Sequence, residues 1–248
     1  DLGDIRGWQI PASGQRLEKV LAQAKEWRFL KSDGVSGEPV AFLHQLFLEY
    51  FAAVYLDRAS QDGGSYAHTV GQHLGSRTAH AEIGTMADAS VVVDWSRWNE
   101  VMVMLAGITE QPDELVRWLA DVAVHGKHRD VPLLAYYCWN TSAAKRDGEA
   151  RAAVIHALTG LLDSVDRYDY DRLHAIKALG EIGDRRSAAP LVSLFRRSKW
   201  EYTRIFCAYA LGLIADLQAA NPLVEALDDT QTDAEVCGWI LQALGRIY

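Results

Sequence analysis

The most apolar stretch of the chain runs from Phe42 to Leu56 and predicts a helix. Twelve of its fifteen residues are apolar or aromatic, and the three that are not, His44, Gln45 and Glu49, fall close together on a helical wheel. Nearly the whole circumference of the helix is therefore expected to be buried. At about 1.5 Å per residue the stretch is only ~22 Å long, so it predicts a central packed helix rather than a membrane span.

The residues before this helix have the pattern of a small mixed unit. Gln15–Trp27 carries apolar residues at helical spacing, and the extended runs Trp27–Lys31 and Pro39–Phe42 flank a glycine-rich turn, which predicts a short β-hairpin. Helix, hairpin and apolar helix together indicate that residues 1–60 are the end of a winged-helix-like domain. An irregular loop between two helices is the alternative.

Residues 61–130 are predicted to form a helical connector. Trp95–Gly107 carries an apolar stripe that ends at a glycine suited to a C-terminal cap, and Pro112–Val124 begins with a proline in its first turn. The connector also contains His68, His73 and His80, but their spacings of five and seven residues do not place three ligands on one helical face. We expect no metal site there.

From residue 131 onward the sequence repeats with a period near 32 residues. The segment Ala-Leu-Gly-x-Ile begins at Ala178, Ala210 and Ala243, and Pro190 and Pro222 stand 32 residues apart, so both helices of a pair recur. This pattern resembles HEAT repeats of the short bacterial kind. The resemblance covers roughly residue 168 to the end, with 131–162 as a degenerate earlier unit, and implies a repeat array over 131–248.

These patterns give the expected fold class: mainly all-α, an α-α superhelix of HEAT-like repeats preceded by a partial winged helix with a short β-hairpin. Within each repeat, small residues such as Ala178 and Gly180 should let the neighbouring helix approach closely. Gly183 suits a left-handed cap before Asp184, and Ala215 would lose about 1 kcal/mol in the same conformation. The third copy stops at Tyr248 before its second helix, so we expect the array to continue.

Aromatic residues near the starts of the first helices are the candidate partner-binding residues. They are Tyr170, Trp200, Tyr202 and Trp239, and they could form an exposed ridge that binds a protein or peptide. The alternative is that they cap the interfaces between repeats. Arginines at 185–186 and 196–197 with Lys199 form a local basic edge, for which a solvated rim is favoured over a phosphate site.

Charge and cysteine usage narrow the possible partners and the compartment. The net charge of −8 and pI near 5.5 make nucleic acid an unlikely partner. Cys138, Cys207 and Cys237 are odd in number and far apart in apolar context, which predicts buried free thiols in a reducing, cytoplasmic setting. The chain does not begin with methionine, and we expect it to be part of a longer protein.

The apolar stretch also carries a family resemblance. Phe42, His44, Phe47 and the run Glu49–Ala53, placed after a hairpin-like segment, resemble the winged-helix signature of the NACHT branch of STAND signalling ATPases. The family usually has serine and glutamine where this chain has Leu46 and Leu48. The resemblance implies that His44 touches the diphosphate of bound ADP in the resting state; a capping or buried histidine is the alternative.

The chain itself lacks the parts of an ATPase. It contains no G-x-x-x-x-G-K-[ST] loop, so ADP or ATP with magnesium would be held by a domain upstream, and we expect no cofactor, no catalytic residue and no enzymatic activity in this chain. A hidden hydrolase has little support, because the sequence offers neither a nucleophile elbow nor a metal-ligand run.

The resemblance then implies a sensor arm. A protein or peptide trigger would bind the array, shift the apolar helix, open the upstream nucleotide domain and permit oligomerisation, which in bacteria often serves defence against phage. The alternative is a free-standing HEAT-repeat scaffold that binds protein, including the bilin-lyase type.

Overall fold

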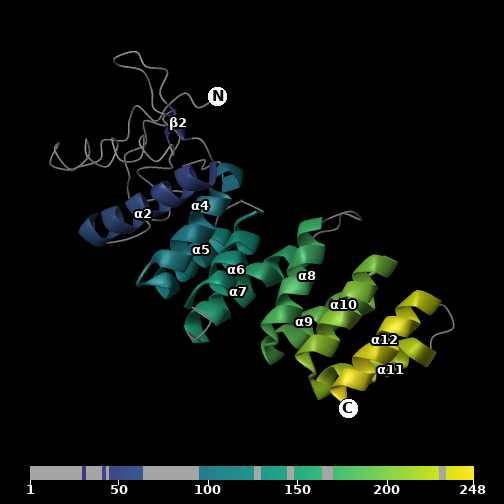
Figure 1. The fold of residues 1–248 in the computed structure, drawn as a ribbon. Coiled ribbons are helices and arrows are strands. Elements are labelled where there is room, and N and C mark those ends of the chain that lie inside the picture. Colours follow the sequence, from purple (N-terminus) through teal and green to yellow (C-terminus); the bar gives the residue numbers. More distant parts are fainter. Residues whose placement is uncertain are drawn as a thin grey trace.

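The structure is a computed structural model that describes residues 30–31, 41–42, 45–63, 95–125, 130–143, 148–163, 170–228 and 233–248. These ranges are mainly helical (Figure 1). The α-helices are α2 (Gln45–Gly63), α4 (Trp95–Ile108), α5 (Pro112–His125), α6 (Val131–Thr141), α7 (Gly148–Gly160), α8 (Tyr170–Ile182), α9 (Ala188–Arg197), α10 (Glu201–Ile214), α11 (Ala220–Asp228) and α12 (Ala234–Ile247). Single 3-10 turns, η3 (Leu161–Asp163), η4 (Arg185–Ser187) and η5 (Leu217–Ala219), follow α7, α8 and α10.

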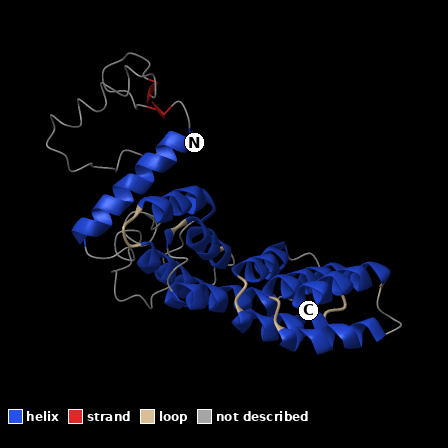
Figure 2. Ribbon diagram, turned by 60° about the horizontal axis from the view of Figure 1, so that its bottom comes forward, coloured by secondary structure: helices blue, strands red, loops and turns tan. Residues whose placement is uncertain are grey.

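From α4 onward the helices alternate between two layers (Figures 1 and 2). In the first layer α4, α6, α8, α10 and α12 contact one another in that order. The second layer holds α5, α7, α9 and α11; α5 packs on α7, α9 contacts η3 at the end of α7, and α9 also contacts η5 at the start of α11. The repeat array predicted for residues 131–248 is therefore a stack of helix pairs, and α4 with α5 extends the same alternation toward the N-terminus.

The helices predicted at 95–107 and 112–124 are confirmed as α4 and α5. The prediction that Gly107 caps α4 is wrong. The helix continues to Ile108, Thr109 donates its backbone N–H to the carbonyl of Leu105 at 3.0 Å, and among the described glycines Gly183 alone has a positive φ. The next turn of α4 still finds an α-helical partner, so the chain has no need of a left-handed residue there.

The helix predicted at 42–56 is present as α2, but its burial differs from the prediction. Glu49, Ala52, Ala53, Leu56 and Ser60 are buried, a single stripe at three- and four-residue spacing, whereas Tyr50 and Phe51 are exposed. Burial all round the helix was thus a wrong expectation: α2 packs on α4 along one face and touches β2 near its N-terminal end.

Two short strands precede α2. Leu30–Lys31 (β1) pairs antiparallel with Ala41–Phe42 (β2), with Leu30 opposite Phe42. Both lie in the extended runs noted in the sequence. The connection between them, the helix predicted at 15–27 and the rest of the expected winged helix lie outside the described residues, so the winged-helix assignment stays a prediction.

A recurring turn joins the two helices of a repeat. After α8, Gly183 adopts φ 67° and Asp184 caps η4 by accepting the backbone N–H of Arg186 at 3.0 Å. After α10, Ala215 adopts φ 52° and Asp216 accepts the backbone N–H of Gln218 at 2.9 Å. The left-handed cap predicted at Gly183 is confirmed, and Ala215 takes the same conformation despite its Cβ.

Small residues let the first-layer helices approach closely, as predicted. A Cβ added to Gly180 of α8 would lie 2.8 Å from both Cα and Cβ of Ala210 on α10, and one on Gly212 would lie 2.9 Å from Cα of Ala243 on α12. Side chains larger than hydrogen do not fit at this separation, so glycine and alanine set the spacing of α8, α10 and α12.

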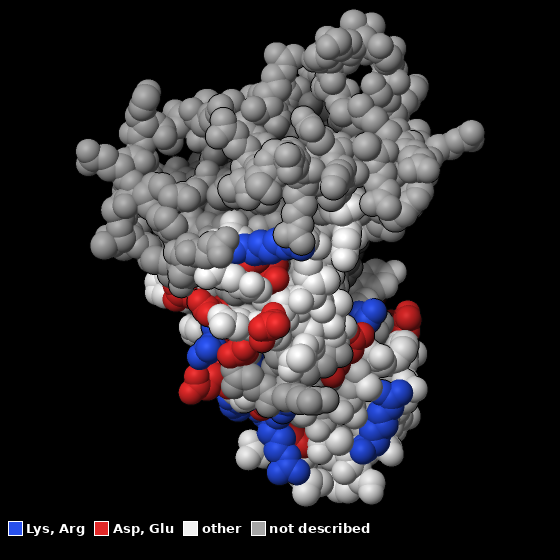
Figure 3. All heavy atoms as spheres, turned by 60° about the vertical axis from the view of Figure 1, so that its left-hand side comes forward, with Lys and Arg blue, Asp and Glu red and all other residues white. Residues whose placement is uncertain are grey.

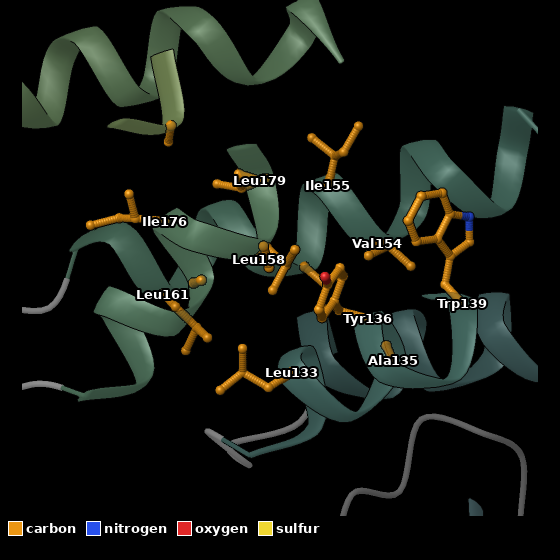
Figure 4. Packing of buried hydrophobic residues seen from close by; sticks show 14 of the residues in the cluster. Leu133, Ala135, Tyr136, Trp139, Val154, Ile155, Leu158, Leu161, Ile176 and Leu179 are labelled. Carbon is orange, nitrogen blue, oxygen red and sulfur yellow. The ribbon is translucent and has the colours of Figure 1, made fainter. Parts of the chain in front are cut away.

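The array is joined at its middle by a packed apolar junction between α6–α7 and α8 (Figure 4). Tyr136 of α6 is buried there, and its hydroxyl donates a hydrogen bond to the carboxylate of Glu181 on α8. Burial and this carboxylate raise the pKa of Tyr136 well above its usual range. The apolar side chains of the junction are Leu133, Leu158, Leu161, Ile155, Ile176 and Leu179.

A candidate peptide-binding groove along the second helix layer

Two adjoining hollows lie along the second layer. The larger, about 670 Å³, spans the C-terminal ends of α5 and α7, the 3-10 turn η3 and the middle of α9. The smaller, about 510 Å³, runs along α9 to Gln218 of η5. Ser193 and Arg197 line both, so the two hollows adjoin at α9, and together, referred to here as the groove, they extend along three successive helix pairs.

The lining of the groove is mixed, and its charged residues are few. Small and aliphatic side chains predominate among the lining residues: Ala123, Val124, Pro132, Ala157, Leu161, Leu162, Ala188, Ala189, Pro190 and Val192. The charged residues that line it are Asp163, Arg196 and Arg197, with His156 as a further titratable group. Aliphatic side chains interspersed with polar groups are typical of surfaces that bind a segment of another protein.

The lining arginines form ion pairs with residues of neighbouring repeats. Arg197 of α9 binds Asp163 of η3 at 2.6 Å and donates to the carbonyl of Leu162 at 3.2 Å, while Arg196 binds Glu225 of α11 at 2.5 Å. All four charged side chains are at least about half exposed. Such pairs contribute about 0–1 kcal/mol each, so they order the rim of the groove without locking it.

A third pair of this kind lies farther toward the N-terminus. Arg117 of α5 binds Glu149 of α7 at 3.1 Å, and also Asp113 one turn before it at 3.1 Å. An arginine–carboxylate pair therefore crosses each described step of the second layer. On the face shown in Figure 3, acidic and basic side chains of the described residues are interspersed accordingly.

The basic edge predicted from the sequence is internally paired. Arg186 binds Asp184 at 2.7 Å, and the hydrogen bond from this guanidinium lowers the pKa of Asp184 to about 2. Since Arg196 and Arg197 are also paired, three of the five cations in that edge already hold carboxylates. This agrees with the solvated rim that the sequence favoured over a phosphate site.

The predicted aromatic residues occupy different environments. Tyr170 and Tyr202 stand at the first turns of α8 and α10, 32 residues apart, and are 70% and 69% exposed. Trp200 is half-buried at the residue before α10. Trp239 lies in the second turn of α12 rather than at its start, and its ring packs edge-to-face on Tyr209 of α10 at 5.8 Å. The structure thus brings Tyr170 and Tyr202 to equivalent exposed positions and sets Trp239 in an interface between repeats.

His44 and the three histidines at 68, 73 and 80 lie outside the described residues, so the ADP contact expected of His44 is a prediction that the geometry does not address. The three cysteines are free thiols; Cys138 and Cys207 are buried, and burial raises the pKa of both well above the usual range, whereas Cys237 is half-buried. Across the described ranges, every helix is too short or too polar to span a membrane.

Sequence reasoning missed the groove itself. Its charged residues could have been suspected, because Arg117 and Glu149 stand 32 residues apart and Arg197 follows Asp163 by 34, both close to the repeat period. The hollow cannot be found in this way, because its depth depends on how far α5, α7 and α9 stand apart.

Comparison with known proteins agrees with this architecture. No curated protein is significantly similar to the chain. Residues 155–245 match the family model for HEAT repeats, which spans the end of α7 through most of α12. The C-terminal part of this chain is therefore a HEAT-like repeat array, and HEAT repeats are typical protein-interaction scaffolds.

Proposed function

We propose that the chain is a protein-binding repeat arm that holds an extended segment of its partner in the second-layer groove. The observation that carries this proposal is that two hollows adjoin along three helix pairs, with Ser193 and Arg197 shared by both. An extended peptide advances about 3.3 Å per residue, so a segment of some ten residues could follow α5, α7 and α9 in turn. The chain acts by binding and needs no catalysis of its own.

A selection of peptides tests where binding occurs. The purified chain is used to select binding peptides from a display library of random twelve-residue peptides. The affinities of the selected peptides, fluorescently labelled, are measured by fluorescence polarisation. Ser193→Trp places an indole in both hollows and should weaken binding at least tenfold, a loss of about 1.4 kcal/mol. The matched control, Tyr170→Ser with Tyr202→Ser, removes the exposed aromatic residues and should leave affinity unchanged.

The opposite result would assign the site to the aromatic ridge and refute the groove. Circular dichroism of both variants establishes that the fold is retained. A library that yields no binder at all also counts against the proposal.

We further propose that this arm is the sensor of a NACHT-like STAND ATPase that serves antiphage defence, and that the ligand of the arm is the trigger. The support is the resemblance of residues 42–53 to the family's winged-helix signature, together with the position of α2, which contacts both β2 and α4. A helix that follows β2 in the chain and packs on α4 could relay a displacement of the array.

This second proposal has its own test. The full-length protein should contain a Walker-type loop before Asp1, bind ADP with magnesium, and lose ADP affinity on His44→Ala. If the full-length sequence lacks such a loop, the sensor role is lost and a free-standing protein-binding scaffold takes its place.

A further inference from the structure

We propose that the groove binds an acidic peptide segment. Carboxylates of this segment would replace Glu225 and Asp163 as the ion-pair partners of Arg196 and Arg197. This inference rests on the proposed function, because it names the kind of partner that the groove would hold. It concerns the charge of that partner, which the proposed function leaves open.

Two arginines line the groove, and each is bound by a carboxylate of the chain itself. In the smaller hollow Arg196 and Arg197 are the charged lining residues, and in the larger one Arg197 faces Asp163. Glu225 binds Arg196 at 2.5 Å but does not line the groove, so two arginines and one aspartate line it although the two ion pairs together are neutral. A ligand carboxylate that replaced Glu225 or Asp163 would therefore meet an arginine.

The carboxylates that now hold these arginines can be displaced at low cost. Asp163 is 79% exposed and Glu225 is 66% exposed, more than the arginines they bind at 49% and 54%. After displacement each carboxylate would stay in water, so little desolvation energy is lost or gained. An exposed pair of this kind contributes about 0–1 kcal/mol, which a better-enclosed carboxylate from a ligand could exceed.

Arg197 is positioned to keep its place during such an exchange. Besides Asp163 it binds the carbonyl of Leu162, so its guanidinium has a second anchor at 3.2 Å that a ligand would not disturb. A planar guanidinium with one edge held by the backbone can offer its remaining donors to a carboxylate. A cationic segment, by contrast, would meet Arg197 in both hollows and find Asp163 already paired.

The test begins with the same peptide selection and asks about composition. Peptides that lose binding on Ser193→Trp should contain more Asp and Glu than Lys and Arg, compared with the input library. Arg196→Ala with Arg197→Ala should then lower their affinity at least tenfold.

A second measurement removes the two carboxylates of the chain that would compete with the peptide for the arginines. Asp163→Asn with Glu225→Gln should raise the affinity for the selected peptides about three- to tenfold, since it releases both arginines. The matched control is Asp113→Asn with Glu149→Gln, which changes the net charge equally at the Arg117 pairs. It should change the affinity by less than twofold at 150 mM salt, where long-range effects are screened.

The outcomes separate the two proposals. If Asp163→Asn with Glu225→Gln weakens binding, or if groove-dependent peptides are neutral or basic, the acidic partner is ruled out while the groove remains the binding site. If both double variants strengthen binding equally, the gain comes from net charge and the exchange of partners is refuted. Peptides that tolerate Ser193→Trp refute the groove itself.

Discussion

Replacement of Gly180 by alanine tests how tightly the first layer is packed. The added Cβ would lie 2.8 Å from two atoms of Ala210, whereas ordinary Cβ contacts begin near 3.4 Å. Helix α10 must therefore move away by about 0.6 Å, and overpacking of this kind costs about 1–3 kcal/mol. Replacing glycine by alanine inside a helix also stabilises the protein by about 1 kcal/mol through helix propensity. The effect at Gly180 must therefore be compared with the same substitution at a glycine that has open space around it.

Gly238 provides this control. It lies inside α12, and nothing stands within 4 Å of the position its Cβ would take. Both substitutions receive the propensity gain, so Gly180→Ala should be less stable than Gly238→Ala by about 1–3 kcal/mol. We would measure this by urea unfolding, with hydrogen exchange of α8 and α12 to detect local opening. Equal stabilisation of both variants would refute the close approach of α8 and α10.

Two other features of the repeat turns give predictions. Ala215→Gly should stabilise the chain by about 1 kcal/mol in urea unfolding because it relieves a left-handed alanine, and Gly183→Ala should destabilise it by a similar amount; the reverse order would refute the cap. The pKa of Asp184 is lowered to about 2, so its contribution to stability is complete above about pH 4 and is lost as the pH falls through 2. Carboxyl NMR titration should find that Arg186→Ala raises this pKa toward its ordinary value, and an unchanged midpoint would exclude the guanidinium as the cause.

The register of the repeats could be predicted from the sequence because the same residue types recur at the same positions in each repeat. A left-handed position followed by an aspartate, and a glycine two residues after an alanine, each have one mechanical use in stacked helices, so Gly183, Asp184 and Gly180 could be assigned before the fold was known. The starts of α4 and α5 were likewise marked by their own apolar stripes.

The burial and exposure of individual side chains could not be predicted in this way, because they depend on which helices pack against them. Composition alone made α2 look buried all round, but burial is set by what packs against a helix, and α4 covers only the stripe that includes Ala53 and Leu56. For the same reason Trp239 could not be separated from Tyr170 and Tyr202. All three are aromatic, but only Trp239 packs on Tyr209 of the preceding first-layer helix, whereas Tyr170 and Tyr202 are exposed.

Both layers of the array contain apolar packing, but the second layer also carries exposed ion pairs that salt can weaken. Contacts at Gly180 and Gly212 fix the first layer by steric exclusion, which salt does not change, whereas arginine–carboxylate pairs at the surface span the second layer and weaken as ions screen them. Raising the ionic strength should therefore weaken the arginine–carboxylate pairs of the second layer and leave the close contacts of the first layer unchanged.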